Sequence, residues 1–111
     1  MQYFFWAAGF IDGEGNIQIR HLKQGDRTYH YPALRINQVD IRPLLRMKDI
    51  FGGTIHKRKP PANPKWQQAY EYTLQGDNLR MLLETILPLL TVKDGQAREA
   101  LELYTRLSTP L

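Results

Sequence analysis

The stretch that most constrains the fold is the apolar run over residues 2–11, together with the four residues that follow it. The run is apolar almost all round a helix, so we expect a helix over Gln2–Ile11 that is buried on more than one side. Asp12, Gly13, Glu14 and Gly15 come next. Glycine is frequent where helices end, so we expect Gly13 and Gly15 to end this helix. Two carboxylates are thereby placed at the end of a buried element.

The bulk composition narrows the class of protein. The chain has 111 residues, and we expect a single domain over residues 1–111. Its net charge of +4 favours a polyanionic partner such as nucleic acid, and the absence of cysteine excludes disulfides and thiolate zinc sites. No apolar run approaches the roughly 20 residues of a membrane helix, and no signal peptide is recognisable. We therefore expect no membrane partner and an intracellular location, in the bacterial cytoplasm or, in a eukaryote, in a chloroplast or mitochondrion.

Periodicity predicts the remaining elements. Alternation of polar and apolar residues predicts strands over residues 16–20, 30–38, 54–59 and 69–74, with a turn at 24–27. Helical spacing predicts helices over 41–51, from 77 toward 87, and over about 95–107, with Asp40, Asp77 and Asp94 as caps and Pro88 as an interruption. The predicted order is α-β-β-α-β-β-α-α. It indicates an α+β fold in which helices cover one face of a four-stranded antiparallel sheet.

The two faces of this sheet differ in chemistry. Alternation turns one set of apolar side chains inward: Ile17, Ile19, Leu34, Ile36, Ile55, Tyr72 and Leu74. The outward set is Asn16, Gln18, Arg20, Ala33, Arg35, Asn37, Thr54, His56, Arg58, Glu71 and Thr73. Arg, Asn, Gln, His and Thr can contact base edges and phosphates, so the outer face predicts a DNA-binding surface. The alternative is an ordinary solvated face, on which Lys and Glu usually dominate.

Basic residues in the loops at 20–27 and 57–65 would extend this DNA-binding surface through Lys23, Arg27, Lys57, Lys59 and Lys65. The histidines at 21, 30 and 56 show no metal-ligand spacing, so we interpret them as surface or DNA-face residues.

Residues 7–15, AAGFIDGEG, resemble the signature of the LAGLIDADG homing endonucleases. The resemblance continues through LRINQ (34–38), FGGTI (51–55) and ILPLLTVKDGQA (86–97), and so covers nearly the whole chain. The predicted order of elements is also that of this family, whose four-stranded sheet is saddle-like. Two positions depart from the family pattern: Glu14 stands where the signature has Asp, and Val39 stands where basic residues are common.

A single motif implies a homodimer, because the second motif helix must come from another copy of the chain. Gly9 and Gly13 are four residues apart and share one helix face, where small side chains let two helices approach closely. The resemblance implies a dimer interface formed by Ala8, Gly9, Ile11, Asp12 and Gly13.

The resemblance also implies metal-dependent hydrolysis of both strands of a long, pseudo-palindromic double-stranded DNA site, as in intron homing. Glu14 and the carbonyl group of Gly13 would bind Mg²⁺, with Mn²⁺ as a substitute, and no small-molecule cofactor is implied. Gln38 would position water, and Lys93 would stabilise charge on the phosphate. A strand-end glutamine and a surface lysine are the alternative interpretations of these two residues.

Two other functional classes stay open at this point. One is a catalytically silent nucleic-acid-binding module of the same fold, either an intron RNA maturase or a DNA-binding regulator. Such proteins tolerate loss of the last motif carboxylate, and here Glu14 is present. The other is a purely structural homodimer, which would not need an Arg-rich outer sheet face.

Overall fold

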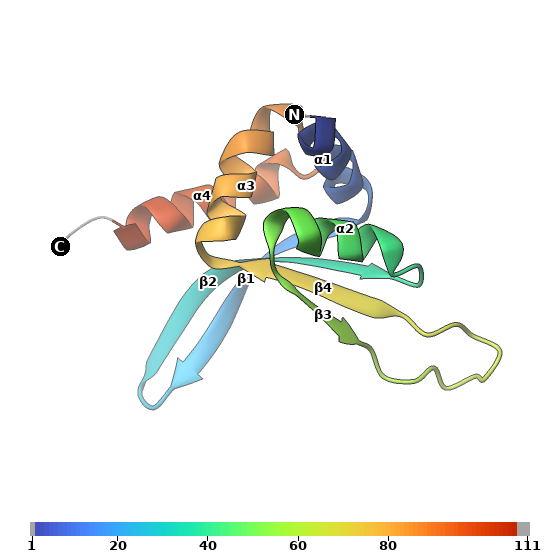
Figure 1. Ribbon diagram of the computed structural model, residues 1–111. Coiled ribbons are helices and arrows are strands. Elements are labelled where there is room, and N and C mark those ends of the chain that lie inside the picture. Colours follow the sequence, from blue (N-terminus) through green and yellow to red (C-terminus); the bar gives the residue numbers. More distant parts are fainter. Residues whose placement is uncertain (1, 109–111) are drawn as a thin grey trace.

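The computed structural model describes residues 2–108 as one antiparallel sheet with helices on a single face (Figure 1). The strands lie in the order β1-β2-β4-β3, and every neighbouring pair is antiparallel. The elements are α1 (Gln2–Glu14), β1 (Gly15–Gln24), β2 (Arg27–Gln38), α2 (Arg42–Phe51), β3 (Thr54–Lys57), β4 (Tyr70–Gln75), α3 (Gly76–Ile86), the 3-10 turn η1 (Leu87–Leu89) and α4 (Asp94–Ser108). The predicted order and fold class are confirmed. None of the helices described is long and apolar enough to cross a membrane.

Helix α1 ends later than the sequence predicts. It runs through Gly13 to Glu14, and β1 begins directly at Gly15. A Cβ atom at Gly15 would lie 2.9 Å from the carbonyl oxygen of Ile11, closer than real Cβ contacts allow. A Cβ atom at Gly13 would have open space around it. Gly15 alone therefore lets the chain pass from helix to strand without a loop, and Gly13 does not end the helix.

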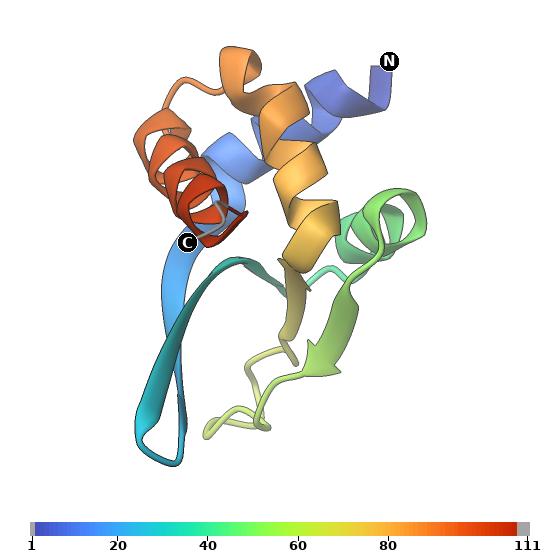
Figure 2. The same cartoon turned by 90° about the vertical axis from the view of Figure 1, so that its left-hand side faces the viewer.

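Strands β1 and β2 are both longer than predicted and form one continuous hairpin. Their pairing is unbroken from Gly15 opposite Ile36 to Gln24 opposite Arg27. The predicted turn is confirmed at Gly25, whose φ of 60° is one that glycine adopts without strain. The hairpin extends well past the helices as an arm (Figures 1 and 2). Strand β3 is shorter than predicted and ends at Lys57, shortly before two prolines that lack N–H donors.

The helix caps follow the prediction only in part. The Asp40 side chain accepts a hydrogen bond from the backbone N–H of Arg42 at 3.0 Å, where α2 begins. Asp77 and Asp94 lie inside the first turns of α3 and α4. The strand-to-helix connection at Gly76, with a φ of 73°, starts α3 before Asp77 can act as its cap.

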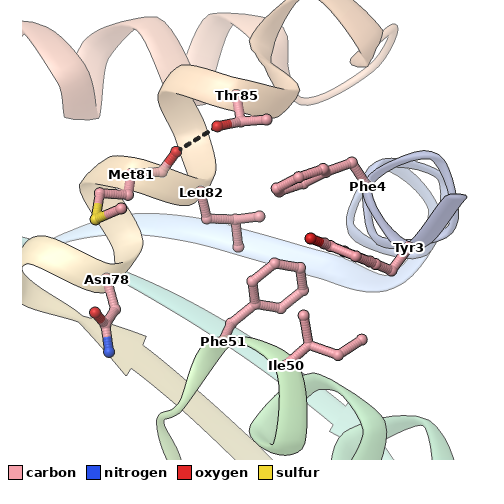
Figure 3. A pocket seen from close by; sticks show the side chains of 8 residues that line it. All are labelled: Tyr3, Phe4, Ile50, Phe51, Asn78, Met81, Leu82 and Thr85. Atoms are coloured by element: carbon pink, nitrogen blue, oxygen red, sulfur yellow. Dashed lines mark hydrogen bonds between the residues drawn. The ribbon is translucent and has the colours of Figure 1, made fainter. Parts of the chain in front are cut away.

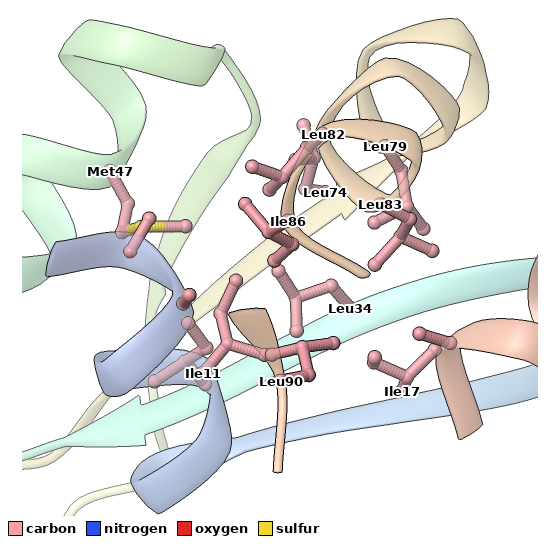
Figure 4. Packing of buried hydrophobic residues seen from close by; sticks show 14 of the residues in the cluster. Ile11, Ile17, Leu34, Met47, Leu74, Leu79, Leu82, Leu83, Ile86 and Leu90 are labelled. Carbon is pink, nitrogen blue, oxygen red and sulfur yellow. The ribbon is translucent and has the colours of Figure 1, made fainter. Parts of the chain in front are cut away.

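The hydrophobic core lies between the sheet and the helices (Figure 4). The inward residues Ile17, Leu34, Ile36, Tyr72 and Leu74 are buried there, as the alternation predicts. Side chains of the helices and of the residue after η1 complete the core, among them Ile11, Met47, Leu79, Leu83, Ile86 and Leu90. All helices therefore pack on one side, which leaves the opposite face of the sheet open (Figure 2).

Asp12 ties the end of α1 to the segment that precedes α4. Its carboxylate accepts backbone hydrogen bonds from Thr91 at 2.7 Å and from Val92 and Lys93 at 2.9 Å. Desolvation alone would raise the pKa of Asp12, but these three N–H donors and the nearby Lys93 charge together hold the pKa below its usual range. A second tie joins the same region to β1, where Gln96 accepts the N–H of Ile17 at 3.1 Å.

We predict that Asp12→Asn lowers the free energy of unfolding by about 1–2 kcal/mol at pH 7, because an amide replaces a charged acceptor of backbone N–H groups. A folded-state pKa below the unfolded value stabilises the protein above about pH 4, and this stabilisation is lost as the pH falls through the folded pKa. The difference between the two proteins should therefore shrink on acidification. Urea unfolding at pH 7 and pH 3 measures it.

The matched control is Asp26→Asn, which removes the same charge from the exposed hairpin turn. It should change the free energy of unfolding by no more than about 0.5 kcal/mol. An Asp12→Asn protein as stable as this control at pH 7 would show that the Asp12 hydrogen bonds do not stabilise the fold.

Candidate active site and nucleic-acid interface

The α1–β1 junction presents an exposed carboxylate beside an amide. Glu14 is the last residue of α1, and Gln38 is the last residue of β2. The pairing of Gly15 with Ile36 returns the end of β2 to the end of α1. As a result, the Gln38 amide Nε2 donates a hydrogen bond to Glu14 Oε2 at 3.1 Å. The structure therefore brings together two of the residues that the sequence predicts to be catalytic.

Lys93 is held near the same junction by a hydrogen bond to Asp12. Its backbone N–H is one of the three groups bound by that carboxylate, and its charge contributes to the lowered pKa of Asp12. Lys93 is half-buried and stands directly before α4. Lys93 therefore lies near Asp12, two residues before Glu14. The structure gives no hydrogen bond between the Lys93 ammonium group and Glu14 or Gln38.

The donors available to a cation at this junction are hard oxygen ligands. The carbonyl group of Gly13 belongs to the last turn of α1, where carbonyl groups lack intrahelical partners. Together with the Glu14 carboxylate it forms a donor set that suits Mg²⁺. Across residues 2–108, no three His, Cys, Asp or Glu side chains gather as a metal cluster.

The outer face of the sheet carries the predicted polar side chains, with three corrections. Ala33 is only 2% exposed, because it lies on the central strand β2 between Gln18 and Gln75. It lines a polar hollow on the outer face, and its methyl group is too short to extend far from the sheet. Lys23 lies within β1, where alternation places it on the helix side of the arm, away from Arg20. Because β1 continues to Gln24, Lys23 is not in a loop as predicted. Lys57 is not in a loop either: it ends β3, where its pairing with Tyr70 places it on the helix side.

The other outward residues keep their predicted face. In the described strands and the loop after β3, they are at least partly exposed: Asn16, Gln18, Arg20, Arg27, Arg35, Asn37, Thr54, His56, Arg58, Lys59, Glu71 and Thr73. Alternation also places Tyr31 and Gln75 on this face, and both line the hollow with Ala33. The prediction missed both: the strand period identifies Tyr31, whereas Gln75 lies one residue beyond the strand predicted over 69–74.

Two pairs of side chains on the strands bind each other. Arg35 and Glu71, both expected to contact DNA, form an ion pair on the outer face. His21 and His30 face each other across the arm, with their Nδ1 atoms 2.6 Å apart. Alternation places both histidines on the helix side, whereas His56 lies on the outer face.

The predicted dimer interface on α1 needs correction at Ala8 and Ile11. They are 2% and 0% exposed and pack in the core of this chain, so their side chains are not available to a partner. Gly9 and Gly13 are exposed, and a Cβ atom at either would have open space. Phe5, 66% exposed, continues their stripe at the i, i+4, i+8 spacing. The prediction missed Phe5, which this spacing identifies.

An apolar cavity of about 230 Å³ lies on the helix side, at the N-terminal part of α1 and between α2 and α3 (Figure 3). Its lining is mostly aromatic and aliphatic: Tyr3, Phe4, Ile50, Phe51, Asn78, Met81, Leu82 and Thr85. It lies away from the α1–β1 junction, so it takes no part in the candidate active site.

Comparison with known proteins gives consistent matches. Residues 7–94 match the family model described as LAGLIDADG endonuclease. The chain is 31% identical over 111 residues to DNA endonuclease I-CvuI of Chlorella vulgaris, covering 94% of this chain and 65% of that protein. The chain therefore spans about two thirds of the length of this relative.

Solved structures show the same fold. The crystal structure of the homing endonuclease I-CvuI, in complex with a DNA target that is not cleaved in the presence of Mg, matches with a TM-score of 0.81 and 28% identity, covering 96% of this chain and 68% of that one. The archaeal intron-encoded homing endonuclease I-Vdi141I, complexed with DNA, matches with a TM-score of 0.78 and 22% identity, covering 96% and 69%. These matches confirm the resemblance seen in the sequence: the chain belongs to the LAGLIDADG endonuclease family.

Proposed function

We propose that this chain is a site-specific homing endonuclease, which binds a long, roughly palindromic double-stranded DNA site as a homodimer and hydrolyses both strands with Mg²⁺. The observation that carries the proposal is the exposed Glu14 carboxylate at the end of α1, hydrogen-bonded to Gln38 at the end of β2. The similarity to I-CvuI, whose crystal structures hold DNA in the presence of Mg or Ca, supports it.

The dimensions of the outer face suit duplex DNA. Strand β2 has 12 residues and so spans roughly 40 Å, slightly more than one turn of duplex at about 34 Å. Arg20 and Arg27 lie along the arm, and Arg58, Lys59 and Lys65 lie on or near the loop after β3. Base contacts from the strands would specify the sequence, and phosphate contacts from the basic residues would position the protein.

The residues at the junction divide the chemistry of hydrolysis among them. Glu14 and the Gly13 carbonyl would hold the cation, and Gln38 keeps the Glu14 carboxylate oriented through its hydrogen bond. Lys93 would place its ammonium group toward the scissile phosphate, where it stabilises the negative charge that develops on the phosphate oxygens. When bound, the metal ion supplies activation of water and stabilisation of the leaving oxygen.

The open stripe on α1 supports the homodimer. Phe5, Gly9 and Gly13 form an apolar strip of the helix that none of the described residues covers. Two such helices related by a two-fold axis could approach closely, because the glycines have no side chains. The same contact would bring two Glu14 carboxylates near the axis and provide one active site for each DNA strand.

We predict that Glu14→Gln abolishes most cleavage while DNA binding is retained. The substitution keeps the size of the side chain but removes the charge that would hold the cation, so the cleavage rate should fall by at least about 100-fold. Two like charges near the axis repel, so the melting temperature in metal-free buffer should be unchanged or higher. Cleavage of a plasmid library with Mg²⁺ and a thermal melt in EDTA measure the two effects.

Glu99→Gln is the matched control, because it removes the same charge from an exposed position on α4. It should cleave at the wild-type rate. Wild-type cleavage should require Mg²⁺ or Mn²⁺, and a Glu14→Gln protein that cuts as fast as wild type would overturn the proposed chemistry. A wild-type protein that binds DNA but cuts none with either metal would favour the catalytically silent binding module.

We predict that Gly9→Leu converts the dimer to a monomer. The substitution should leave the fold of the chain intact, since a Cβ atom at Gly9 would have open space among the described residues. Sedimentation at micromolar concentration should show a wild-type dimer and a mutant monomer. Gly95→Leu makes the same change at another glycine with open space, on α4, and should stay dimeric. A wild-type monomer that cuts both strands would exclude the dimer.

A further inference from the structure

The Arg35–Glu71 ion pair lies near the centre of the open face of the sheet. Arg35 belongs to β2 and lies opposite Thr73, whereas Glu71 belongs to β4 and lies opposite Asn37. The two side chains are therefore diagonal neighbours on adjacent strands, a separation that long side chains span. Both point to the outer face, the one that would contact DNA.

The pair uses only one edge of the guanidinium group. A single oxygen of Glu71, Oε1, accepts hydrogen bonds from Arg35 Nε, at 2.8 Å, and from Arg35 Nη2. A guanidinium group has five N–H bonds, so three remain, two on Nη1 and one on Nη2. These form the end of the fork, which is the edge that pairs with the O6 and N7 atoms of guanine.

Burial distinguishes this pair from the ion pairs on the surface. The side chain of Glu71 is 16% exposed, against 46% to 71% for the carboxylates of Asp40, Glu84 and Glu102 in the other described ion pairs, and Arg35 is 32% exposed. The pair also lines the polar hollow of about 130 Å³ whose other walls are Arg20, Tyr31, Ala33, Thr73 and Gln75. Partial burial reduces screening by solvent, so this pair should hold its geometry better than an exposed one.

A paired arginine has two properties at a DNA surface. Its orientation is set before DNA arrives, so little side-chain entropy is lost when a base is bound. Its charge is also largely neutralised by the carboxylate, so it attracts phosphates of any sequence less than a free arginine would. Both properties favour contact with a base over contact with the backbone.

We infer that Glu71 is a positioning residue for Arg35, and that the pair, through the free end of the Arg35 guanidinium group, binds one guanine in each half-site of the DNA target. The inference deepens the proposed DNA-binding function and depends on it. Glu71 acts on the arginine and makes no base contact of its own, which differs from the sequence-based expectation that it contacts DNA directly.

The test is selection of bound duplexes from a random double-stranded library by wild-type protein and by Glu71→Gln. Wild type should select a site with a guanine at one fixed position of each half-site. In Glu71→Gln, preference at that position alone should fall about tenfold. Affinity for random-sequence DNA should rise severalfold, and the salt dependence of that binding should steepen by about one unit, because the Arg35 charge is released.

Three control variants separate the possible causes. Glu102→Gln removes the same charge from an exposed ion pair on α4 and should leave the selected sequence unchanged. Arg35→Lys keeps the charge but loses the fork, so it should lose the same guanine preference, and adding Glu71→Gln to it should cause no further loss. Lys59→Ala, in the exposed loop after β3, should weaken binding to all sequences equally.

Each outcome has a distinct meaning. A wild-type protein that selects no sequence overturns the proposed function together with this inference. A wild-type protein that selects a site, with a Glu71→Gln profile identical to it, overturns the inference alone. Loss of preference spread over many positions also overturns it, since that is the effect of a purely structural residue. If Glu71→Gln melts early, Glu71→Asp gives the same test, because its shorter side chain cannot make both hydrogen bonds to Arg35.

Discussion

The direct passage of α1 into β1 is the constraint on which the rest of the structure depends. No loop separates the two elements, and only a glycine at position 15 keeps the strand clear of the Ile11 carbonyl group. Asp12, one turn earlier than Gly15, binds three backbone N–H groups in front of α4. A single short segment thus sets the start of the sheet, the start of the last helix and the position of the Glu14 carboxylate.

The sheet register then supplies the second half of the site. Because β1 starts at the end of α1, the strand paired with it must return to the same place, and Gln38 reaches Glu14 as a result. The same register determines which side chains are neighbours on the outer face, where Arg35 of β2 pairs with Glu71 of β4. Site and surface are therefore both consequences of how β2 pairs with its neighbours, and a shift by one residue would turn every side chain of β2 to the wrong face.

Elements and faces could be predicted from the sequence because they depend on local periodicity. Alternation alone placed Ile17, Leu34 and Tyr72 in the core and Asn37 outside it. Contacts between distant segments could not be predicted in this way. Asp12 binds residues about 80 positions away, and no local pattern indicates that a motif carboxylate is engaged by backbone N–H groups.

The proposed dimer face on α1 was also hard to predict from the sequence. Small residues at Ala8, Gly9 and Gly13 looked alike in sequence, yet Ala8 packs inward and the glycines stay open. The α1 helix is apolar all round, and the sheet and the other helices decide which of its sides packs against the core of the same chain. Sequence composition does not contain that information, whereas the choice of Phe5, Gly9 and Gly13 follows once the core is known.

These constraints converge on one electrostatic problem in the proposed homodimer. The chain carries a net charge of +4. At the α1–β1 junction, however, the Glu14 carboxylate lies at the C-terminus of a helix, which is the negative end of the helix dipole. Bringing two such helix ends together in a dimer costs electrostatic free energy, because the two Glu14 carboxylates repel each other. A single chain has no such cost. Cations held by Glu14 would reduce that repulsion, and bound DNA would attract cations to the same region through its phosphates. Metal binding, dimerisation and DNA binding should therefore be thermodynamically coupled, with Glu14 as the group through which each affects the others.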